Sequence, residues 1–212
     1  MSDSVAVDLF VEDTGHEQFL RPLVARLTAE EGVPVRVQVR SALGGRPRVL
    51  REFGLYQKTA SLMASGGGVA DLVVVAIDAN CSPYATARSR IREFVLPAFE
   101  DRVVTACPDP HVERWYLANL ESFKAIIGRG PETVEEKCAR GHYKGILKSA
   151  VIQAGHPASD GIDFAPALVA GMDLYRAGRS DSSLKAFLDE FRAAIRRLAT
   201  DTGPTPAVAG RR

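Results

Sequence analysis

The chain has little cysteine, and what it has is widely scattered. Only three of its 212 residues are cysteines, namely Cys81, Cys107 and Cys138, and none belongs to a CxxC pair. A disulfide framework or a structural zinc site is therefore not expected, because both need cysteines at closer or regular spacings. The sequence predicts three reduced, partly buried thiols.

Long apolar runs and targeting signals are also lacking. No run approaches the roughly 20 apolar residues that a membrane-spanning helix needs. The opening residues, MSDSVAVDLF, lack a basic stretch and a cleavage site and run directly into a strand-like pattern. We therefore expect a cytoplasmic protein that does not enter a membrane.

Several catalytic motifs are missing. The sequence contains no GxSxG elbow, no Walker A loop and no GxGxxG motif, which argues against serine hydrolases, P-loop enzymes and dinucleotide-binding enzymes. The histidines show no metal-ligand spacing; they are His16, His111, His142 and His156.

An excess of charge of either sign is lacking as well. The chain carries 27 basic and 26 acidic side chains, for a net charge of +1. A protein that coats nucleic acid is usually strongly basic, so a nucleic-acid substrate would require a local basic surface here. With 46% hydrophobic and 25% charged residues, the composition is that of a globular protein. Its length suits one large α/β domain, or an ordinary domain with an appendage.

What is present is an alternation of strands and helices. Short apolar runs predict strands at Val5–Val11, Val33–Val39, Asp71–Ile77 and Arg102–Ala106. Helical spacing predicts helices at 16–31, Val49–Ala64, Tyr84–Phe99 and His111–Phe123. Strands that alternate with helices form parallel sheets, so the fold class is α/β, with a parallel Rossmann-like sheet flanked by helices.

From about Glu132 onward the pattern is helical only. Expected helices are Tyr143–Ala154, Ala165–Ala177 and Ser182–Leu198. We expect an α/β domain at 1–130, a helical C-terminal extension packed on it at 131–200, and a disordered tail at 201–212. Asp13 is expected to cap the first helix, Gly32 to close it, and Asp181 or Ser182 to cap the last. Ser65–Gly68 is expected to be a flexible break.

Acidic residues follow three of the predicted strands. Glu12 and Asp78 come directly after buried strands, and Glu113 lies a few residues after the fourth. Ligands of open parallel sheets bind beyond the carboxyl ends of the strands. Carboxylates gathered there repel one another unless a cation compensates them, and Mg²⁺ or Mn²⁺ would suit oxygen ligands. For any one position, helix capping or simple exposure to water is the commoner explanation.

The order of these motifs resembles the TOPRIM (topoisomerase–primase) superfamily. FVEDTGHEQFLRPLV resembles its first motif, in which a glutamate ends the first strand, and LVVVAIDAN resembles its second, normally Asp-x-Asp. PDPHVERWYLAN, YKGILKSA and SLKAFLDEF resemble elements of small bacterial TOPRIM-like proteins of unknown function, related to the OLD-family nucleases. The resemblance covers roughly Val5 to Arg196. It departs at Asn80, where the second aspartate is expected.

The resemblance implies a metal-dependent site. Glu12 and Asp78 would hold Mg²⁺ or Mn²⁺, with Asn80 and Glu113 as weaker or second-site ligands. Asparagine can still offer its carbonyl oxygen but brings no charge, so two-metal activity is in question. Lys144 would neutralise negative charge that develops on a phosphate, although a solvated lysine on a helix is at least as common a reading.

Arginines near these motifs are candidates for contact with a phosphate backbone. Arginine donates two hydrogen bonds at once from a planar fork, which suits phosphate. The candidates for nucleic-acid binding are Arg46, Arg48, Arg88 and Arg114. Arginines spaced along a helix more often form a solvated face.

Three functions remain open on the sequence alone. The first is a metal-dependent nuclease or related phosphoryl-transfer protein acting on DNA or RNA, with a role in defence against foreign DNA and a partner protein from a defence or mobile-element system. The second is a non-catalytic TOPRIM-like module that binds nucleic acid or a partner. The third is a regulatory α/β domain with an acidic pocket.

Overall fold

The computed structural model describes residues 4–41, 44–62, 69–132, 136–139, 141–157 and 159–201. Within these ranges the chain is an α/β protein with a four-stranded, all-parallel sheet in the order β2-β1-β3-β4. The strands are β1 (Val5–Val11), β2 (Val35–Ser41), β3 (Leu72–Ala76) and β4 (Val103–Ala106). The α/β class and the parallel sheet flanked by helices are confirmed.

The strand order places a topological switch point between β1 and β3. From β1 the chain moves to β2 on one side, then crosses back to β3 and β4 on the other. Open α/β sheets bind ligands in the crevice that forms where the order reverses, outside the carboxyl ends of the strands. Glu12 and Asp78 lie just beyond the strands that flank this point.

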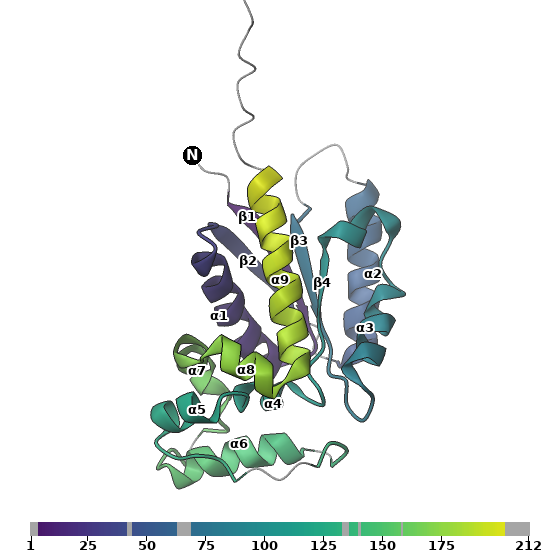
Figure 1. Cartoon of the computed structure of the whole chain (residues 1–212). Helices are drawn as coiled ribbons and strands as arrows, with labels where there is room; N and C mark the ends of the chain where they lie inside the picture. Colours follow the sequence, from purple (N-terminus) through teal and green to yellow (C-terminus); the bar gives the residue numbers. More distant parts are fainter. Residues whose placement is uncertain are drawn as a thin grey trace, which may run out of the picture.

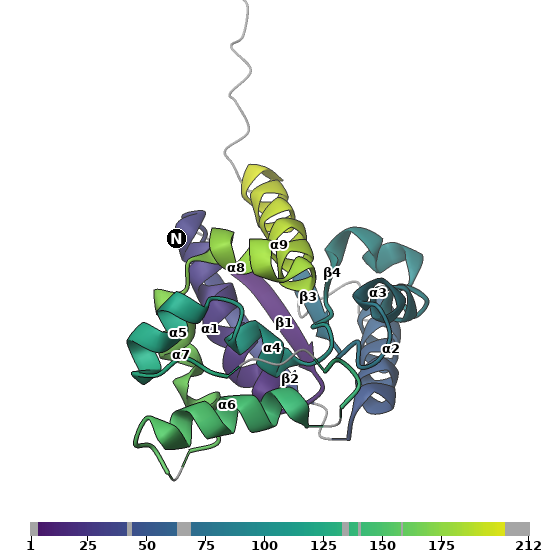
Figure 2. The ribbon, with the colours of Figure 1, turned by 60° about the horizontal axis from the view of Figure 1, so that its bottom comes forward.

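Helices cover both faces of the sheet (Figure 1). On one face lie α1 (Thr14–Glu30) and α9 (Ser182–Asp201), and on the other α2 (Arg46–Leu62) and α3 (Tyr84–Arg92). Shorter helices gather at the carboxyl ends of the strands, as Figure 2 shows. These are α4 (Val112–Tyr116), α5 (Leu120–Ile127), α6 (His142–Gln153), α7 (Ala165–Gly171) and α8 (Leu174–Ser180).

The apolar side chains form two cores, one on each face of the sheet. Alternate residues of a strand point to opposite faces, so Val74 packs with α1 and the C-terminal helices while Val73 and Val75 pack with α2 and α3. The apolar stripe of α9 joins the first core, and its Phe187 stacks on Trp115. Residues 143–195 thus contribute to the same core as β1.

Local signals set the helix ends as expected in several places. Asp13 caps α1 by accepting the backbone N–H of His16 at 3.0 Å. Gly32 follows that helix with a φ of 68°, a conformation that glycine adopts at little cost. Asp181 caps α9 by accepting the backbone N–H of Leu184 at 2.9 Å.

Three expected helices are shorter or broken. The helix predicted over Tyr84–Phe99 ends at Arg92, and a 3-10 helix, η1 (Pro97–Arg102), follows it. The side-chain amide of buried Gln57 donates to the carbonyl of Phe94 and accepts the N–H of Leu96, each at 2.8 Å. These two hydrogen bonds satisfy backbone groups that a continuous helix would have paired.

The other two breaks arise from caps within the predicted helices. Asn119 is extended and accepts the N–H of Ser122 at 2.8 Å, so the helix predicted over His111–Phe123 becomes α4 and α5. Asp173 accepts the N–H of Arg176 at 3.0 Å, which divides Ala165–Ala177 into α7 and α8. A second 3-10 helix, η2 (Ile162–Phe164), precedes α7. Asparagine and aspartate favour such caps because their side chains compete for backbone groups.

The flexible break expected at Ser65–Gly68 lies outside the described ranges, as does all of the expected tail at 201–212 except Asp201, which is the last residue of α9. Among the helices that the structure describes, none has the length and apolar character needed to cross a membrane.

Candidate functional site

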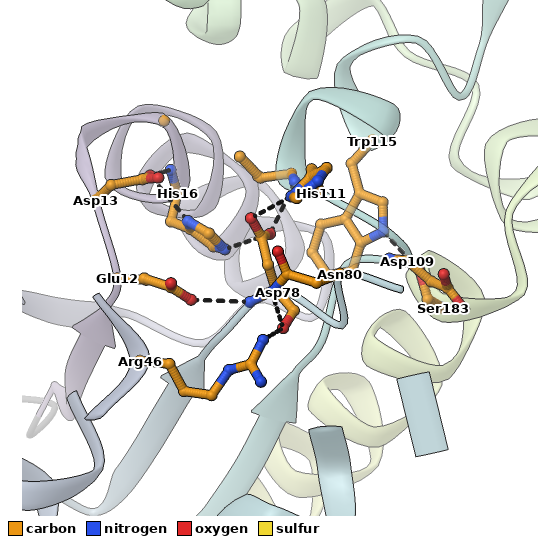
Figure 3. A network of polar contacts seen from close by, with 12 residues as sticks. Glu12, Asp13, His16, Arg46, Asp78, Asn80, Asp109, His111, Trp115 and Ser183 are labelled. Carbon is orange, nitrogen blue, oxygen red and sulfur yellow. Dashed lines mark hydrogen bonds and ion pairs between the residues drawn. The ribbon is translucent and has the colours of Figure 1, made fainter. Parts of the chain in front are cut away.

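Asp78 lies at the centre of a polar cluster at the carboxyl end of β3 (Figure 3). Its Oδ1 accepts the backbone N–H of Val112 at 3.0 Å, and its Oδ2 lies 2.9 Å from Nδ1 of His111. Nε2 of His16 approaches Oδ1 to 3.1 Å, at an angle outside hydrogen-bond geometry. Both carboxylate oxygens of Asp78 are therefore engaged by groups of the protein itself.

His16 connects Asp78 to a second carboxylate. It stands in the first turn of α1, fully buried, and its Nδ1 lies 2.9 Å from Oδ1 of Asp13. A row of alternating carboxylates and imidazoles results, in the order Asp13, His16, Asp78, His111. We call these four side chains the Asp–His row. A buried carboxylate is stabilised when charged partners surround it in this way.

The two inner members of the row shift each other's pKa in opposite directions. Burial alone would lower the pKa of His16, but the charge of Asp78 and the hydrogen bond with Asp13 raise it well above its usual range. Burial would likewise raise the pKa of Asp78, but the charge of His16 and the hydrogen bond from His111 hold it below its usual value. His16 and Asp78 therefore each stabilise the charged form of the other.

The pKa values of the outer members, Asp13 and His111, are shifted by the same effects. Burial tends to raise the pKa of Asp13, yet its side-chain hydrogen bond and attraction to His16 lower it to about 2. The hydrogen bond to Asp78 raises the pKa of His111, against the opposing effect of burial. His111 is the more accessible of the two imidazoles, with 22% of its side chain exposed against none for His16.

Glu12 and Arg46 hold the backbone at Asp78. Oε2 of Glu12 accepts the N–H of Asp78 at 3.1 Å, and the Arg46 guanidinium donates from Nη2 to the carbonyl of Asp78 at 2.6 Å. Nε of Arg46 is buried without a hydrogen-bond partner among the described residues. Glu12 and Asp78, expected to meet if their strands were neighbours, do lie side by side at the switch point (Figure 3).

Glu113 belongs to α4 and adds a further carboxylate to this region. Burial raises its pKa, and the charges of Asp78 and Asp13 raise it further. Those charges act on it because the carboxylates are close together. Burial is the largest cause of the raised pKa, and the neighbouring negative charges add to it.

Asn80 has a local structural role. Among the described residues other than glycine, Asn80 is the one with a positive φ, which is 56°. Asparagine tolerates this left-handed conformation better than most residues do. Its side-chain nitrogen donates to the carbonyl of Asp78 at 3.3 Å. At this position an aspartate would present an acceptor to that carbonyl instead of a donor.

Buried hydrogen bonds join the turn before α4 to the start of α9. Oγ of Ser183 accepts the indole N–H of Trp115 at 2.9 Å and the backbone N–H of Asp109 at 3.1 Å. The same hydroxyl donates to Oδ1 of Asp181 at 2.6 Å. The start of α9 is thereby joined to the segment that carries His111.

Comparison with protein-family models, with curated proteins and with solved structures finds no match to this chain. The chemistry of the site must therefore be inferred from its own geometry.

The other residues proposed from the sequence lie at various distances from this centre. Lys144 is exposed on α6 and makes no polar contact with any described residue. Arg48 pairs with Glu52 at 2.7 Å, one turn along α2. Arg88 lies 3.6 Å from Glu190, on α9.

Arg114 lies on α4 beside Glu113 and contacts two other elements. Its guanidinium reaches the hydroxyl of Tyr143 at 3.4 Å and lies 3.6 Å from Oδ2 of buried Asp181. These partners line a polar cavity of about 360 Å³ next to the turn that precedes His111. Arg114 thus has a structural role in addition to any contact with a ligand.

Sequence reasoning missed both histidines of the row. Each follows a strand end and stands at the start of a helix, His16 in the first turn of α1 and His111 as the residue before α4. Spacing between the histidines gave no signal, because their common partner is Asp78 on a third segment. Their position relative to strand ends was the available signal.

The side chains of this site are of the types that bind a divalent cation, but they are not arranged to bind one. Carboxylate oxygens are the ligands that Mg²⁺ and Mn²⁺ prefer. Among the described residues, however, no three His, Cys, Asp or Glu side chains are arranged to hold a metal ion as they stand. Binding at Asp78 would require one of its present partners to move, and His111 is the accessible one.

Proposed function

We propose that this chain is a metal-dependent phosphoryl-transfer protein of the TOPRIM type, a nuclease acting on nucleic acid. The observation that carries the proposal is the pairing of Glu12 and Asp78 at the switch point, with Oε2 of one 3.1 Å from the N–H of the other. The first and second motifs of the resemblance meet where an α/β sheet binds its ligand.

Glu12 and Asp78 would hold the cation, with Glu113 close by. Bound there, a divalent ion would stabilise negative charge on a phosphate group. The charges of Asp78 and Asp13, which add to the effect of burial on the pKa of Glu113, are negative charges that a cation there would compensate. His111 is the side chain that would give way, because it is partly exposed and His16 is enclosed.

Residues of the chain itself would position the substrate. Arg46 already spans the edge of the site, where its Nη2 holds the carbonyl of Asp78, and its Nη1 would be the donor to a phosphate oxygen. In its protonated form, Glu113 would hold a proton that it could give to a departing oxygen. Three contacts hold the Asp78 carboxylate against rotation, two from the imidazoles of the Asp–His row and one from the backbone N–H of Val112.

A path for the nucleic-acid strand leads away from Arg46 along α2. A cavity of about 650 Å³ begins at Arg46, and Arg51, Lys58 and Phe94 also line it. Arg51 and Lys58 are exposed and form no ion pair with any described residue. The unpaired cations are suited to binding phosphates, and the exposed aromatic ring beside them is suited to stacking on bases.

The wider context remains part of the proposal. The helical extension over 131–200 and the cytoplasmic location are expectations from the sequence pattern, whereas the TOPRIM-like character of the sheet and a role in defence against foreign DNA rest on the sequence resemblance. The partner protein of a defence or mobile-element system has the same basis.

The test is cleavage of labelled single- and double-stranded DNA and RNA over a series of Mg²⁺ and Mn²⁺ concentrations. Glu12→Gln is the matched variant, because its amide oxygen can still accept the Asp78 N–H while the charge is lost. We expect cutting by the wild type and none by Glu12→Gln, at equal melting temperatures. Equal cutting by both proteins, or none by either, would contradict the nuclease proposal.

One observation favours a second function, a non-catalytic module that binds nucleic acid or a partner. Both oxygens of Asp78 are engaged by the protein's own donors, and Asn80 donates to the Asp78 carbonyl where a second carboxylate would be expected. A salt-sensitive complex with nucleic acid that forms equally well in EDTA, without cleavage, would favour the module over the nuclease.

A further inference from the structure

The cavity of about 650 Å³ along α2 has apolar walls as well as cations, and we call it the α2 groove. Its apolar lining includes Leu50, Leu55, Phe94 and Leu96. Two of these side chains are open to water, because Leu55 is 57% exposed and Phe94 44% exposed. Large apolar side chains that are exposed together in one groove indicate a ligand with an apolar face of its own.

The turn that carries Phe94 is fixed to α2. The fully buried Gln57 binds both the carbonyl of Phe94 and the N–H of Leu96, each at 2.8 Å, with the two ends of one amide. A Cβ at Gly54 would lie 3.9 Å from Cδ1 of Phe94, so the ring lies directly beside the backbone of α2. The ring is therefore held in place before a ligand arrives, which lowers the entropy cost of binding.

Cations line the same groove along one face of α2. Arg51 and Lys58 are about two helical turns apart, and both are exposed and form no ion pair with any described residue. Arg46 stands at the end of the groove nearest Asp78, whose carbonyl it binds. Glu93 is the one acidic side chain among the described lining residues. The groove therefore carries a surplus of positive charge, which favours an anionic ligand.

We propose that the α2 groove binds single-stranded nucleic acid, with an unpaired base stacked on Phe94 and neighbouring phosphates bound by Arg51 and Lys58. Between Arg46 and Lys58 the helix rises about 18 Å, a length that a few nucleotides of one strand span. The proposal takes its ligand class from the proposed function, but it needs neither a metal ion nor cleavage.

The apolar walls select a single strand over a duplex. Inside a duplex, each base is covered by its neighbours and cannot stack on a ring of the protein. The outer surface of a duplex is a row of phosphates, which would lose water against Leu50 and Leu55 without gaining a hydrogen bond. An unpaired base has an open aromatic face, and that face can replace the water on Phe94 and Leu55.

The test is the affinity of the full-length chain for three fluorescent probes, measured by anisotropy in EDTA at one salt concentration. The probes are an oligothymidylate of about 12 nucleotides, a strand of equal length in which every site is abasic, and a duplex of equal length. The abasic strand keeps the phosphates and lacks the bases. We expect the wild type to bind the oligothymidylate about tenfold more tightly than either other probe, because one stacked base contributes at least that factor.

Two variants of Phe94 separate stacking from charge. Phe94→Leu keeps an apolar side chain without an aromatic face, so its affinity for oligothymidylate should fall about tenfold, to that for the abasic strand. Phe94→Trp keeps an aromatic face and should keep the preference. Because the ring is partly exposed, both variants should melt near the wild-type temperature. Arg51→Ala with Lys58→Ala should instead weaken binding to the oligothymidylate and the abasic strand by the same factor.

Several results would overturn the proposal. They are equal or tighter binding of the duplex, equal binding of the abasic strand, and an unchanged preference in Phe94→Leu. A wild-type dimer that Leu55→Glu converts to a monomer would assign the groove to a second copy of the chain instead. Cleavage with metal but no preference among the probes would remove this inference and leave the nuclease proposal. A preference in EDTA without cleavage in metal would do the reverse.

Discussion

Replacing His16 with glutamine should destabilise the fold in a pH-dependent way. His16 is fully buried between Asp13 and Asp78. Removing one partner of a buried ion pair costs about 3–5 kcal/mol. Asp78 keeps Val112 and His111, and glutamine can still donate one hydrogen bond, so we expect about 2–3 kcal/mol near pH 6. For a chain of this size that lowers the melting temperature by roughly 4–12 °C.

The pH dependence follows from the direction of the pKa shift. The folded-state pKa of His16 is raised, so its stabilisation is fully present below the unfolded value of about 6.5 and is lost as pH rises through the folded value. The difference in free energy of unfolding between wild type and His16→Gln should therefore be largest near pH 6 and shrink at alkaline pH. Urea unfolding at a series of pH values measures it.

A difference in unfolding free energy that stays constant from pH 6 to alkaline pH, to within about 0.5 kcal/mol, would refute the stabilisation of charged His16 by Asp78. His156→Gln is a suitable control, because His156 is exposed and lies outside the row. Its effect should be small at every pH.

Three further outcomes are expected. Ser183→Ala should cost about 1–3 kcal/mol in urea unfolding, because the buried indole N–H of Trp115 loses its acceptor; a cost under about 0.5 kcal/mol would mean that another acceptor replaces the hydroxyl. Asn80→Gly should leave the melting temperature within about 4 °C of wild type, since glycine suits a φ of 56°, whereas Asn80→Val should lower it more; equal effects would contradict the local explanation. Arg51→Ala with Lys58→Ala should weaken nucleic-acid binding and reduce its salt dependence by about two phosphate contacts, while Arg129→Ala should not; equal salt slopes would remove α2 from the binding path.

The sequence was sufficient for the strands and for the meeting of Glu12 and Asp78. Apolar runs identify buried strands, and strand–helix alternation identifies a parallel sheet, because both depend on local periodicity. The cap at Asp13 was predictable for the same reason. Helix breaks were less predictable, because the break at Phe94 depends on Gln57, a residue from another element.

The partners of Asp78 could not be predicted from spacing. They come from α1 and from the segment after β4, and only the folded sheet brings them together. The sequence suggested that a cation compensates the clustered carboxylates, but it could not show that two imidazoles occupy that role for Asp78.

The most direct test of the proposed site is a crystal structure with Mn²⁺, examined for anomalous density near Asp78. We predict a peak about 2.0–2.6 Å from carboxylate oxygens of both Glu12 and Asp78, with the His111 side chain turned away from Asp78. A crystal of Asp78→Asn grown under the same conditions should show no peak there. Full Mn²⁺ saturation with no peak between Glu12 and Asp78, and His111 still bound to Asp78, would contradict the metal site.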